Sequence, residues 1–331
     1  MQARRTFTVT AIISLAVLAA SASISAQKPT KNLMDSWPTK PIKILVGFPG
    51  GTTPDMAART LAEPLSKALG QTVIVENRPG ASGNIAADAV SKATDDHTIG
   101  VVINGNLTSA KMLYSKLPYD PAKDFTYISL LATSPLVLVT TPDQPTGADF
   151  FNAARSGGDK WNYGSPGIGT VGHLGMEYLK SKVGGLNAVH VPYTGYPQVA
   201  TALLGGQLQM ALMAPGVAMP QVRAGKLKVI GATGGRSALL PDVPSLAEAG
   251  LRDLNLEVWT ALVGPANLSP AAKTKLAIEV GKAIREADTR QKLFNQGWQA
   301  VGSSPEGLQN RVKSEAAIMS GIITTSGIKL E

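Results

Sequence analysis

The chain has 331 residues, a formal net charge of +8 at pH 7 and no cysteine. The lack of cysteine excludes disulfides, thiolate metal sites and thiol nucleophiles. Its lysines and arginines are scattered, whereas a nucleic-acid footprint is clustered, so we interpret the charge as solubility with a mild attraction for anionic solutes. The length suits two ordinary domains.

The N-terminal segment has the pattern of a cleaved export signal. Arg4 and Arg5 precede an apolar run over 7–20, which is followed by the small residues "SASISA". This pattern predicts a signal peptide over 1–26, with cleavage near Ala22 or Ala26 and a mature N-terminus between Ser23 and Lys28. The run is short for a bilayer span, and an uncleaved anchor is the alternative. Both the general secretory and the twin-arginine export routes stay open. Without a cysteine at the cleavage site, we expect a free periplasmic protein.

From residue 40 the sequence alternates between apolar runs and amphipathic segments. It predicts strands at 41–48, 72–77 and 98–103, and helices at 55–69 and 84–93. Gly70 is the expected stop of the first helix, and Ser82 is the expected cap of the second. Strands that alternate with helices favour a parallel sheet with helices on both faces.

The pattern starts again after residue 133. It predicts strands at 134–142, 160–164, 188–193, 207–214 and 226–233, and helices at 147–157, 171–182, 196–206 and 218–225. A strand at 256–264 and two or three amphipathic helices complete the chain. The sequence therefore predicts two α/β units of similar size with a cleft between them.

Two glycine-rich turns connect a predicted strand to a predicted helix, one in each half. In the first, Gly50 and Gly51 are followed by Thr52 and Thr53, and Asp55 is placed to cap the helix. The exposed amides and the positive end of the helix dipole favour a carboxylate or phosphate. The turn lacks the Gly-Lys-Ser/Thr of a nucleotide-binding P-loop, and a mere connection between strand and helix is the alternative.

The second turn, Gly167 to Gly172, matches G-x-G-x-x-G. A dinucleotide site also needs an acidic residue about 20 positions later, and the stretch there is "NAVHVPY", so the pattern disfavours NAD. The two turns share one design. If the two helix starts face each other across a cleft, they can hold an anion without a buried lysine or arginine.

No group of residues in the sequence assembles a reaction centre. The three histidines, His97, His173 and His190, lack metal-ligand spacing. His173 lies in the first turn of its helix, where a structural role is favoured over a contact with ligand. Ser165 is no nucleophile elbow, because Tyr163 stands in place of the first glycine. The four tryptophans are expected in the core. We therefore expect a protein that is not an enzyme and has no cofactor.

Several stretches of the sequence resemble motifs of one protein family and occur in the same order along the chain. They include "WPTKPIKILVGFPGGTTPDMAAR", "VIVENRPGASGNIAADAV", "YGSPGIGTVGHL", "VPYTGYPQVATALLGGQLQMA" and "LPDVPSLAEAG". This pattern resembles the Bug receptors, the extracytoplasmic solute-binding components of tripartite tricarboxylate transporters. The resemblance covers nearly the whole mature chain.

The resemblance implies a two-lobed periplasmic-binding-protein fold, type II-like, in which each lobe is a mixed sheet flanked by helices. Lobe 1 would comprise 37–131 and 252–331, and lobe 2 would comprise 132–251, with hinge crossings near Leu131 and Leu251. The resemblance also implies that the two turns hold a ligand carboxylate, partly through ordered water. The implied ligand-binding residues are Phe48, Gly51, Thr52, Thr53, Asn104, Asn106, Ser165, Gly167, Ile168, Gly169, Thr170 and Tyr193.

Three positions depart from the pattern of the family. The first turn continues Thr52-Thr53-Pro54-Asp55 where further glycine is usual, Asn104-Gly105-Asn106 replaces a stretch that often holds histidine, and Gln209 replaces an aspartate. The identity of the ligand is therefore left open by the sequence. The resemblance implies a monomeric receptor that delivers a small carboxylate to permease subunits in the membrane. An exported α/β enzyme on a phosphorylated or acyl substrate, and a receptor that feeds a sensor, are the alternatives.

Overall fold

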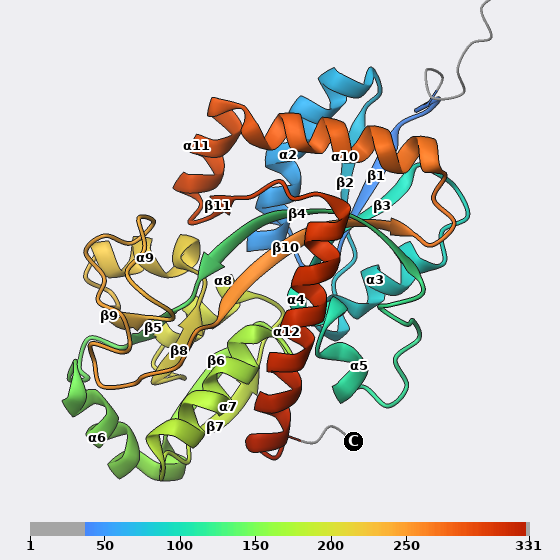
Figure 1. Cartoon of the computed structure of the whole chain (residues 1–331). Helices are drawn as coiled ribbons and strands as arrows, with labels where there is room; N and C mark the ends of the chain where they lie inside the picture. The colour runs from blue at the N-terminus through green and yellow to red at the C-terminus, as the bar shows by residue number, and fades with distance from the viewer. Residues whose placement is uncertain (1–36, 329–331) are drawn as a thin grey trace, which may run out of the picture. The chain divides into compact units, whose positions relative to one another are not determined.

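The computed structural model describes residues 37–328, so the predicted signal peptide lies outside the described residues. The first lobe is built on a six-stranded sheet in the order β11-β4-β10-β3-β1-β2 (Figure 1). Its strands are β1 (Ile42–Val46), β2 (Val73–Asn77), β3 (Thr98–Ile103), β4 (Phe125–Pro135), β10 (Glu257–Pro265) and β11 (Gln299–Ala300). β1 runs parallel to β2 and β3, whereas β10 runs antiparallel to β3 and β4.

The second lobe is built on a five-stranded sheet in the order β7-β6-β8-β5-β9. Its strands are β5 (Val137–Thr140), β6 (Asn162–Ser165), β7 (Val189–Pro192), β8 (Met210–Met213) and β9 (Lys228–Ala232). β6 is parallel to β7 and β8, and β5 is antiparallel to β8 and β9. Both sheets are mixed and flanked by helices, which confirms the predicted fold class. The all-parallel order expected from the first half holds only for β2, β1 and β3.

Most helices lie at the predicted positions, whereas the short α4 and α5 were not predicted. They are α2 (Thr53–Leu69), α3 (Asn84–Ser91), α4 (Asn104–Leu107), α5 (Ala110–Leu113), α6 (Ala148–Gly157), α7 (Val171–Val183), α8 (Tyr196–Leu204), α9 (Pro215–Arg223), α10 (Pro270–Arg285), α11 (Ala287–Asn295) and α12 (Pro305–Thr325). The expected cap at Ser82 is wrong, because Ser82 lies in a short 3₁₀ turn with φ of 55°, and α3 begins after Gly83 without a side-chain cap. None of the described helices is both long and apolar enough to cross a membrane.

Helix α2 positions the first turn against the sheet. It buries Ala58, Leu61, Leu65 and Leu69 in the same apolar cluster as Ile44 of β1. This spacing of three to four residues is that of one helix face, so burial of the face fixes where the helix begins. The helix ends at Gly70, whose φ of 66° suits glycine.

The two lobes are joined where single segments pass from one sheet to the other. β4 ends at Pro135 and β5 begins at Val137, so the chain changes sheets at Leu136. It returns to the first sheet before Glu257. Helix α12, which packs on β4, also contacts α7 of the second lobe (Figure 1).

Candidate functional site

The starts of helices from both lobes surround a small buried cavity of about 30 Å³. Thr52 and Thr53 lie at the start of α2, Thr170 at the start of α7, and Gly195 at the start of α8. The full lining is Phe48, Thr52, Thr53, Pro54, Ile103, Asn104, Pro166, Thr170, Val171, Gly195, Tyr196, Val258 and Trp298. Helix N-termini carry partial positive charge, so this arrangement favours an anion although no Lys or Arg is among these residues.

In the first turn, the threonines face the cavity and Gly51 does not line it. Thr52 Oγ1 donates to Pro49 O at 2.6 Å, whereas the buried Thr53 Oγ1 has no partner among the described residues. The amide of Gly51 donates to Asp55 Oδ2 at 2.8 Å. A Cβ atom at Gly51 would meet no atom within 4 Å, so a substitution there does not fill the cavity. It strains the backbone instead, because the φ of Gly51 is 78°. Gly51 thus shapes the turn.

Asp55 closes the first turn from inside the helix. Its side chain is buried and accepts hydrogen bonds from Arg59, Asn77 and the Gly51 amide. Burial alone would raise the pKa of Asp55, but these hydrogen bonds outweigh it and hold the pKa below its ordinary value. Asp55 was expected to cap the helix, and its carboxylate accepts from the Gly51 amide just before the helix.

In the second turn, Thr170 lines the cavity and the glycines bond within the protein. The amide of Gly169 donates to His173 Nδ1 at 3.2 Å, and the amide of Gly167 donates to Ser165 Oγ at 3.2 Å. Thr170 Oγ1 donates to Gly167 O at 2.7 Å. The backbone amides of these two glycines are therefore engaged, and His173 has the structural role that was favoured.

The second turn is also tied to the opposite lobe. Ser109 Oγ donates to Gly169 O at 2.7 Å, and Tyr114 OH donates to Ile168 O at 3.2 Å. Outside these contacts lies a groove of about 340 Å³, whose lining includes Phe48, Gly167, Ile168 and Tyr193. Gly167, Ile168 and Tyr193 therefore line the outer part of the cleft and not the inner cavity.

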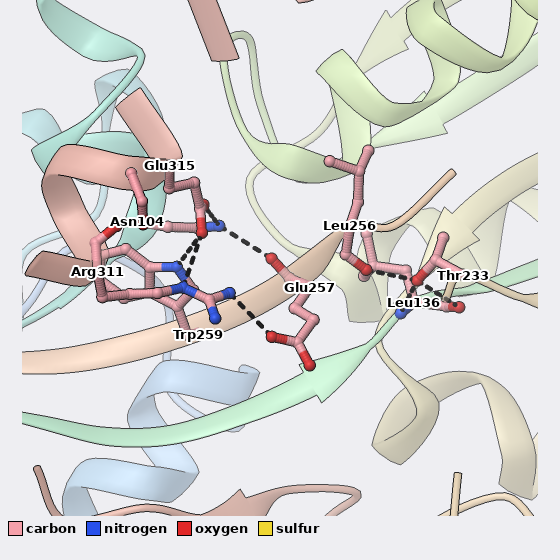
Figure 2. Close-up of polar contacts among 9 residues, drawn as sticks. Asn104, Leu136, Thr233, Leu256, Glu257, Trp259, Arg311 and Glu315 are labelled. Carbon is pink, nitrogen blue, oxygen red and sulfur yellow. Dashed lines mark hydrogen bonds and ion pairs between the residues drawn. The ribbon is translucent and has the colours of Figure 1, made fainter. Parts of the chain in front are cut away.

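The two predicted asparagines have different roles. Asn106 is buried, donates to Asn84 Oδ1 at 2.8 Å and accepts from the Ile103 amide, so its side chain holds the loop together. Asn104 lines the cavity, and Figure 2 shows its side-chain nitrogen bonded to Glu315 and to the carbonyl of Glu257. Its Oδ1 is buried and has no partner among the described residues.

Trp298 lines the cavity, although nothing in the sequence indicated this. It was expected in the core, and it is indeed only 1% exposed, but it also lines the cavity. It follows α11 and comes from the far C-terminal part of the chain. No local motif marks it, because only the folding of α11 against α2 brings this part of the chain to the first turn. Among the described residues, no group of three His, Cys, Asp or Glu could hold a metal ion.

Comparison with known proteins gives the family. Residues 57–328 match the family described as "Tripartite tricarboxylate transporter family receptor". A UPF0065 protein of Bordetella pertussis is 32% identical over 323 residues, which cover 96% of this chain and 97% of the relative. A solved structure described as "R. palustris Rpa4515 with adipate" is 30% identical with a TM-score of 0.85, over 89% of this chain and all of that one. MatC (Rpa3494) from Rhodopseudomonas palustris, with bound malate, is 29% identical with a TM-score of 0.82, over 87% of this chain and all of that one. The chain therefore belongs to the receptor family of the tripartite tricarboxylate transporters, as its sequence motifs indicated.

Proposed function

We propose that the protein is an exported receptor that binds a small organic carboxylate in the cleft between its lobes. The observation that carries the proposal is the buried cavity at the starts of α2, α7 and α8, where three lining residues have a polar atom without a partner among the described residues. Such groups are costly unless a ligand or water satisfies them. Two similar proteins have dicarboxylates, adipate and malate, in their structures.

The chemistry of binding follows from the helix starts. The first amides of a helix have no partner within the helix, and the dipole places partial positive charge there. A carboxylate at this point accepts from amides and from the hydroxyl of Thr53. A hydrogen bond to a charged group contributes roughly 1.5–3 kcal/mol, so a few of them give micromolar or tighter binding without a paired cation.

Opening at the hinge would admit the ligand. The cavity is smaller than the volume of a typical ligand pocket, roughly 300 Å³ or more. The lobes contact each other through Ser109 and Tyr114. We therefore propose that lobe 1 (37–131 and 252–331) and lobe 2 (132–251) separate by rotation at crossings near Leu131 and Leu251 and close again around the ligand.

An enzymatic function is less well supported. Ser165 Oγ lies 2.7 Å from His190 Nε2, which is the pairing that a serine nucleophile needs. However, Ser165 is fully buried, its hydroxyl also contacts Gly167, and it does not line the cavity. We therefore propose binding without turnover. Mass spectrometry of the bound anion after long incubation should recover it unchanged, and conversion lost in a Ser165→Ala variant would favour the enzyme.

The proposal also covers how the protein reaches the periplasm and where it delivers the bound anion. We propose export with a mature N-terminus between Ser23 and Lys28, action as a monomer in the periplasm, and delivery of the anion to permease subunits. N-terminal sequencing of the periplasmic protein checks the cleavage. Uptake of the anion by cells that lack the gene, with and without its plasmid-borne copy, separates transport from a role in signalling.

Removal of one cavity hydroxyl should weaken binding. For Thr53→Val, we expect the dissociation constant for the best-bound dicarboxylate to rise about tenfold or more, because one hydrogen bond to a charged group is lost. Calorimetric titration over succinate, malate, adipate and citrate measures it. Thr133→Val is the matched control, since its hydroxyl also has no partner among the described residues but does not line the cavity. Equal affinity of the two variants would contradict the proposed site.

A further inference from the structure

Two hydroxyl groups of lobe 1 donate to backbone carbonyls of the second turn, which belongs to lobe 2. Ser109 Oγ donates to Gly169 O at 2.7 Å, and Tyr114 OH donates to Ile168 O at 3.2 Å. Ser109 and Tyr114 flank the two ends of α5, and Ser109 is only 1% exposed. A carbonyl only accepts hydrogen bonds, so lobe 1 supplies the proton in both contacts.

Glycine lets the two lobes approach each other closely at this contact. A Cβ atom on Gly105, in α4 of lobe 1, would lie 3.2 Å from Gly169 O in lobe 2, which is tighter than ordinary van der Waals contact. A Cβ atom on Gly167 of lobe 2 would overlap with Ser82 Oγ of lobe 1. These glycines therefore make room for the opposite lobe, and this role is separate from any contact with ligand.

The part of lobe 1 that meets the second turn is a strained segment, and lobe 1 itself holds it in place. The four successive residues 80–83 have positive φ, and two of them, Ala81 at 47° and Ser82 at 55°, are not glycine. Such a conformation persists only where the surrounding structure holds it. Asn106 Nδ2 donates to Ser82 O at 3.1 Å, and Ser82 Oγ lies 3.3 Å from Tyr114 OH. All of these groups belong to lobe 1, so this surface keeps its shape without the second turn.

The contact lies apart from the buried cavity at the helix starts. Ser109, Tyr114, Ile168 and Gly169 are not among the residues that line that cavity. They line a space of about 10 Å³ instead, which has room for no more than a water molecule. Tyr114 and Ile168 also border the outer groove, whereas Ser109 does not. The hydrogen bond from Ser109 therefore acts between the lobes and not on a ligand.

We propose that Ser109 and Tyr114 form a latch, which holds the lobes closed through the carbonyls of the second turn and thereby sets how long a ligand stays bound. Both are positioning residues, because they act on the second turn. The inference rests on the proposed binding between the lobes and adds the rate of release. A ligand enters before the latch forms and leaves only after it breaks. Loss of the latch therefore accelerates dissociation and leaves association nearly unchanged.

Removal of either hydroxyl group should speed the release of the ligand. The variants are Ser109→Ala and Tyr114→Phe, and the probe is the most tightly bound of succinate, malate, adipate and citrate. Stopped-flow tryptophan fluorescence measures both rate constants. We expect the dissociation rate constant to rise about three- to tenfold, which corresponds to the loss of one hydrogen bond, and the association rate constant to change by less than about twofold.

Two matched controls lose a hydrogen bond of the same kind within one lobe. Tyr127 OH donates to Pro121 O at 2.9 Å, and Ser129 Oγ donates to Ser303 O at 2.9 Å. In both contacts the donor and the carbonyl belong to lobe 1. Tyr127→Phe and Ser129→Ala should therefore leave both rate constants unchanged, even where they lower the stability of the protein.

One added methyl group tests the same contact without removing a donor. In Gly105→Ala, the new Cβ atom would press on Gly169 O across the two lobes, whereas its distance to Ser109 Oγ of its own lobe is an ordinary 3.5 Å. Alanine favours a helix more than glycine does, so stability should not fall. We expect dissociation to accelerate at least about threefold while the urea midpoint is unchanged or higher. A purely structural role would lower stability and binding together.

The distance between the lobes gives a second measurement, which needs no ligand. The chain has no cysteine, so Lys116→Cys in lobe 1 and Asn187→Cys in lobe 2, both at exposed positions, provide a unique pair of sites for spin labels. Pulsed dipolar spectroscopy measures the distribution of distances between the two labels. We expect the population at the shorter distance to be smaller with Ser109→Ala than in the labelled parent, and unchanged with Ser129→Ala.

The outcomes separate the latch from the proposed function. An unchanged dissociation rate constant or an unchanged distance distribution with Ser109→Ala would overturn the latch and leave ligand binding intact. If only Tyr114→Phe speeds release, the phenol group acts on the ligand in the outer groove and the latch is wrong. If none of the four anions binds, the proposed function fails for them, and the label distances alone decide whether the latch exists.

Discussion

At the scale of single residues, the second turn depends on the buried His173 and the half-buried His190. The rings of His173 and His190 are stacked with centroids 4.1 Å apart, and His173 accepts a hydrogen bond from the Gly169 amide. Burial lowers the pKa of His173 to about 4, with Lys180 adding to this and Glu177 opposing it. Burial lowers the pKa of His190 to about 3, and His173 and Lys180 contribute. Both rings are therefore neutral at pH 7.

The lowered histidine pKa values predict a loss of stability in weak acid. A group with a folded pKa below its unfolded value of about 6.5 binds protons more readily when unfolded, so stability is full above pH 6.5 and falls as the pH drops toward 4. Between pH 7 and 5, His173 alone should cost roughly 2 kcal/mol of unfolding free energy. Urea denaturation at the two pH values measures it.

The variant His173→Asn gives the control for this prediction. The amide oxygen of Asn can still accept from Gly169 but does not titrate, so the variant should lose less stability between pH 7 and 5 than the wild type. His97 also has a lowered pKa, mainly through burial, but it lies in the other lobe. The same pH dependence in the wild type and in His173→Asn would show that other groups cause it.

At the scale of the element, helix α2 owes the shape of its first turn to one carboxylate. Asp55 stands at the third position of the helix and reaches back to the Gly51 amide, while Asn77 at the end of β2 donates to both Asp55 and the Phe48 carbonyl. The turn between β1 and α2 is thus held from the helix and from the neighbouring strand. This arrangement keeps Thr52 and Thr53 at the cavity.

Removal of this carboxylate should destabilise the protein and loosen the turn. For Asp55→Ala, we expect a loss of about 1–2 kcal/mol in unfolding free energy, which is typical of a lost helix cap, together with weaker ligand binding. Asp149→Ala is the matched control, since Asp149 is an exposed acidic residue in the first turn of α6. Denaturant unfolding and calorimetry measure both effects. Equal stability of the two variants would argue against the role of Asp55.

At the scale of the whole molecule, one threonine connects both passages between the lobes. Thr233 Oγ1 accepts from the Leu136 amide at 2.9 Å and lies 2.5 Å from Leu256 O, to which it donates (Figure 2). Leu136 is where the chain leaves the first sheet, and Leu256 directly precedes β10, where it returns. The buried Thr233 therefore holds the two segments that connect the sheets side by side.

Removal of the Thr233 hydroxyl should lower the stability of the protein. For Thr233→Val, we expect a loss of about 1–3 kcal/mol in unfolding free energy, because a buried amide and a buried carbonyl lose their partner. Thr201→Val, on the exposed face of α8, should change stability by less than about 0.5 kcal/mol. Chemical denaturation checks both. A wild-type unfolding curve for Thr233→Val would show that water replaces the hydroxyl and that the hinge does not depend on it.

The sequence was sufficient for the elements and for the family. Apolar periodicity marked α2 and α7, because a helix face that must be buried repeats every three to four residues. The mixed character of the sheets was less visible locally: β10 inserts between β3 and β4 although it lies far along the chain, and strand order depends on contacts between distant segments. Ser82 looked like a cap because its residue type suits one, and the backbone of the 3₁₀ turn overrode that preference.

Within the site, the sequence by itself determined the two glycine turns and the threonines at the helix starts, since these depend on neighbours in the chain. Only the tertiary structure decided which polar groups of the site have a partner within the protein. Gly51 and Gly169 use their amides on Asp55 and His173, whereas the cavity-lining residues Thr53, Asn104 and Trp298 each have a buried polar atom that has no partner among the described residues. The reason is physical: a hydrogen bond within a turn is local, but the bond that fixes Asn104 comes from Glu315 on α12, at the other end of the chain.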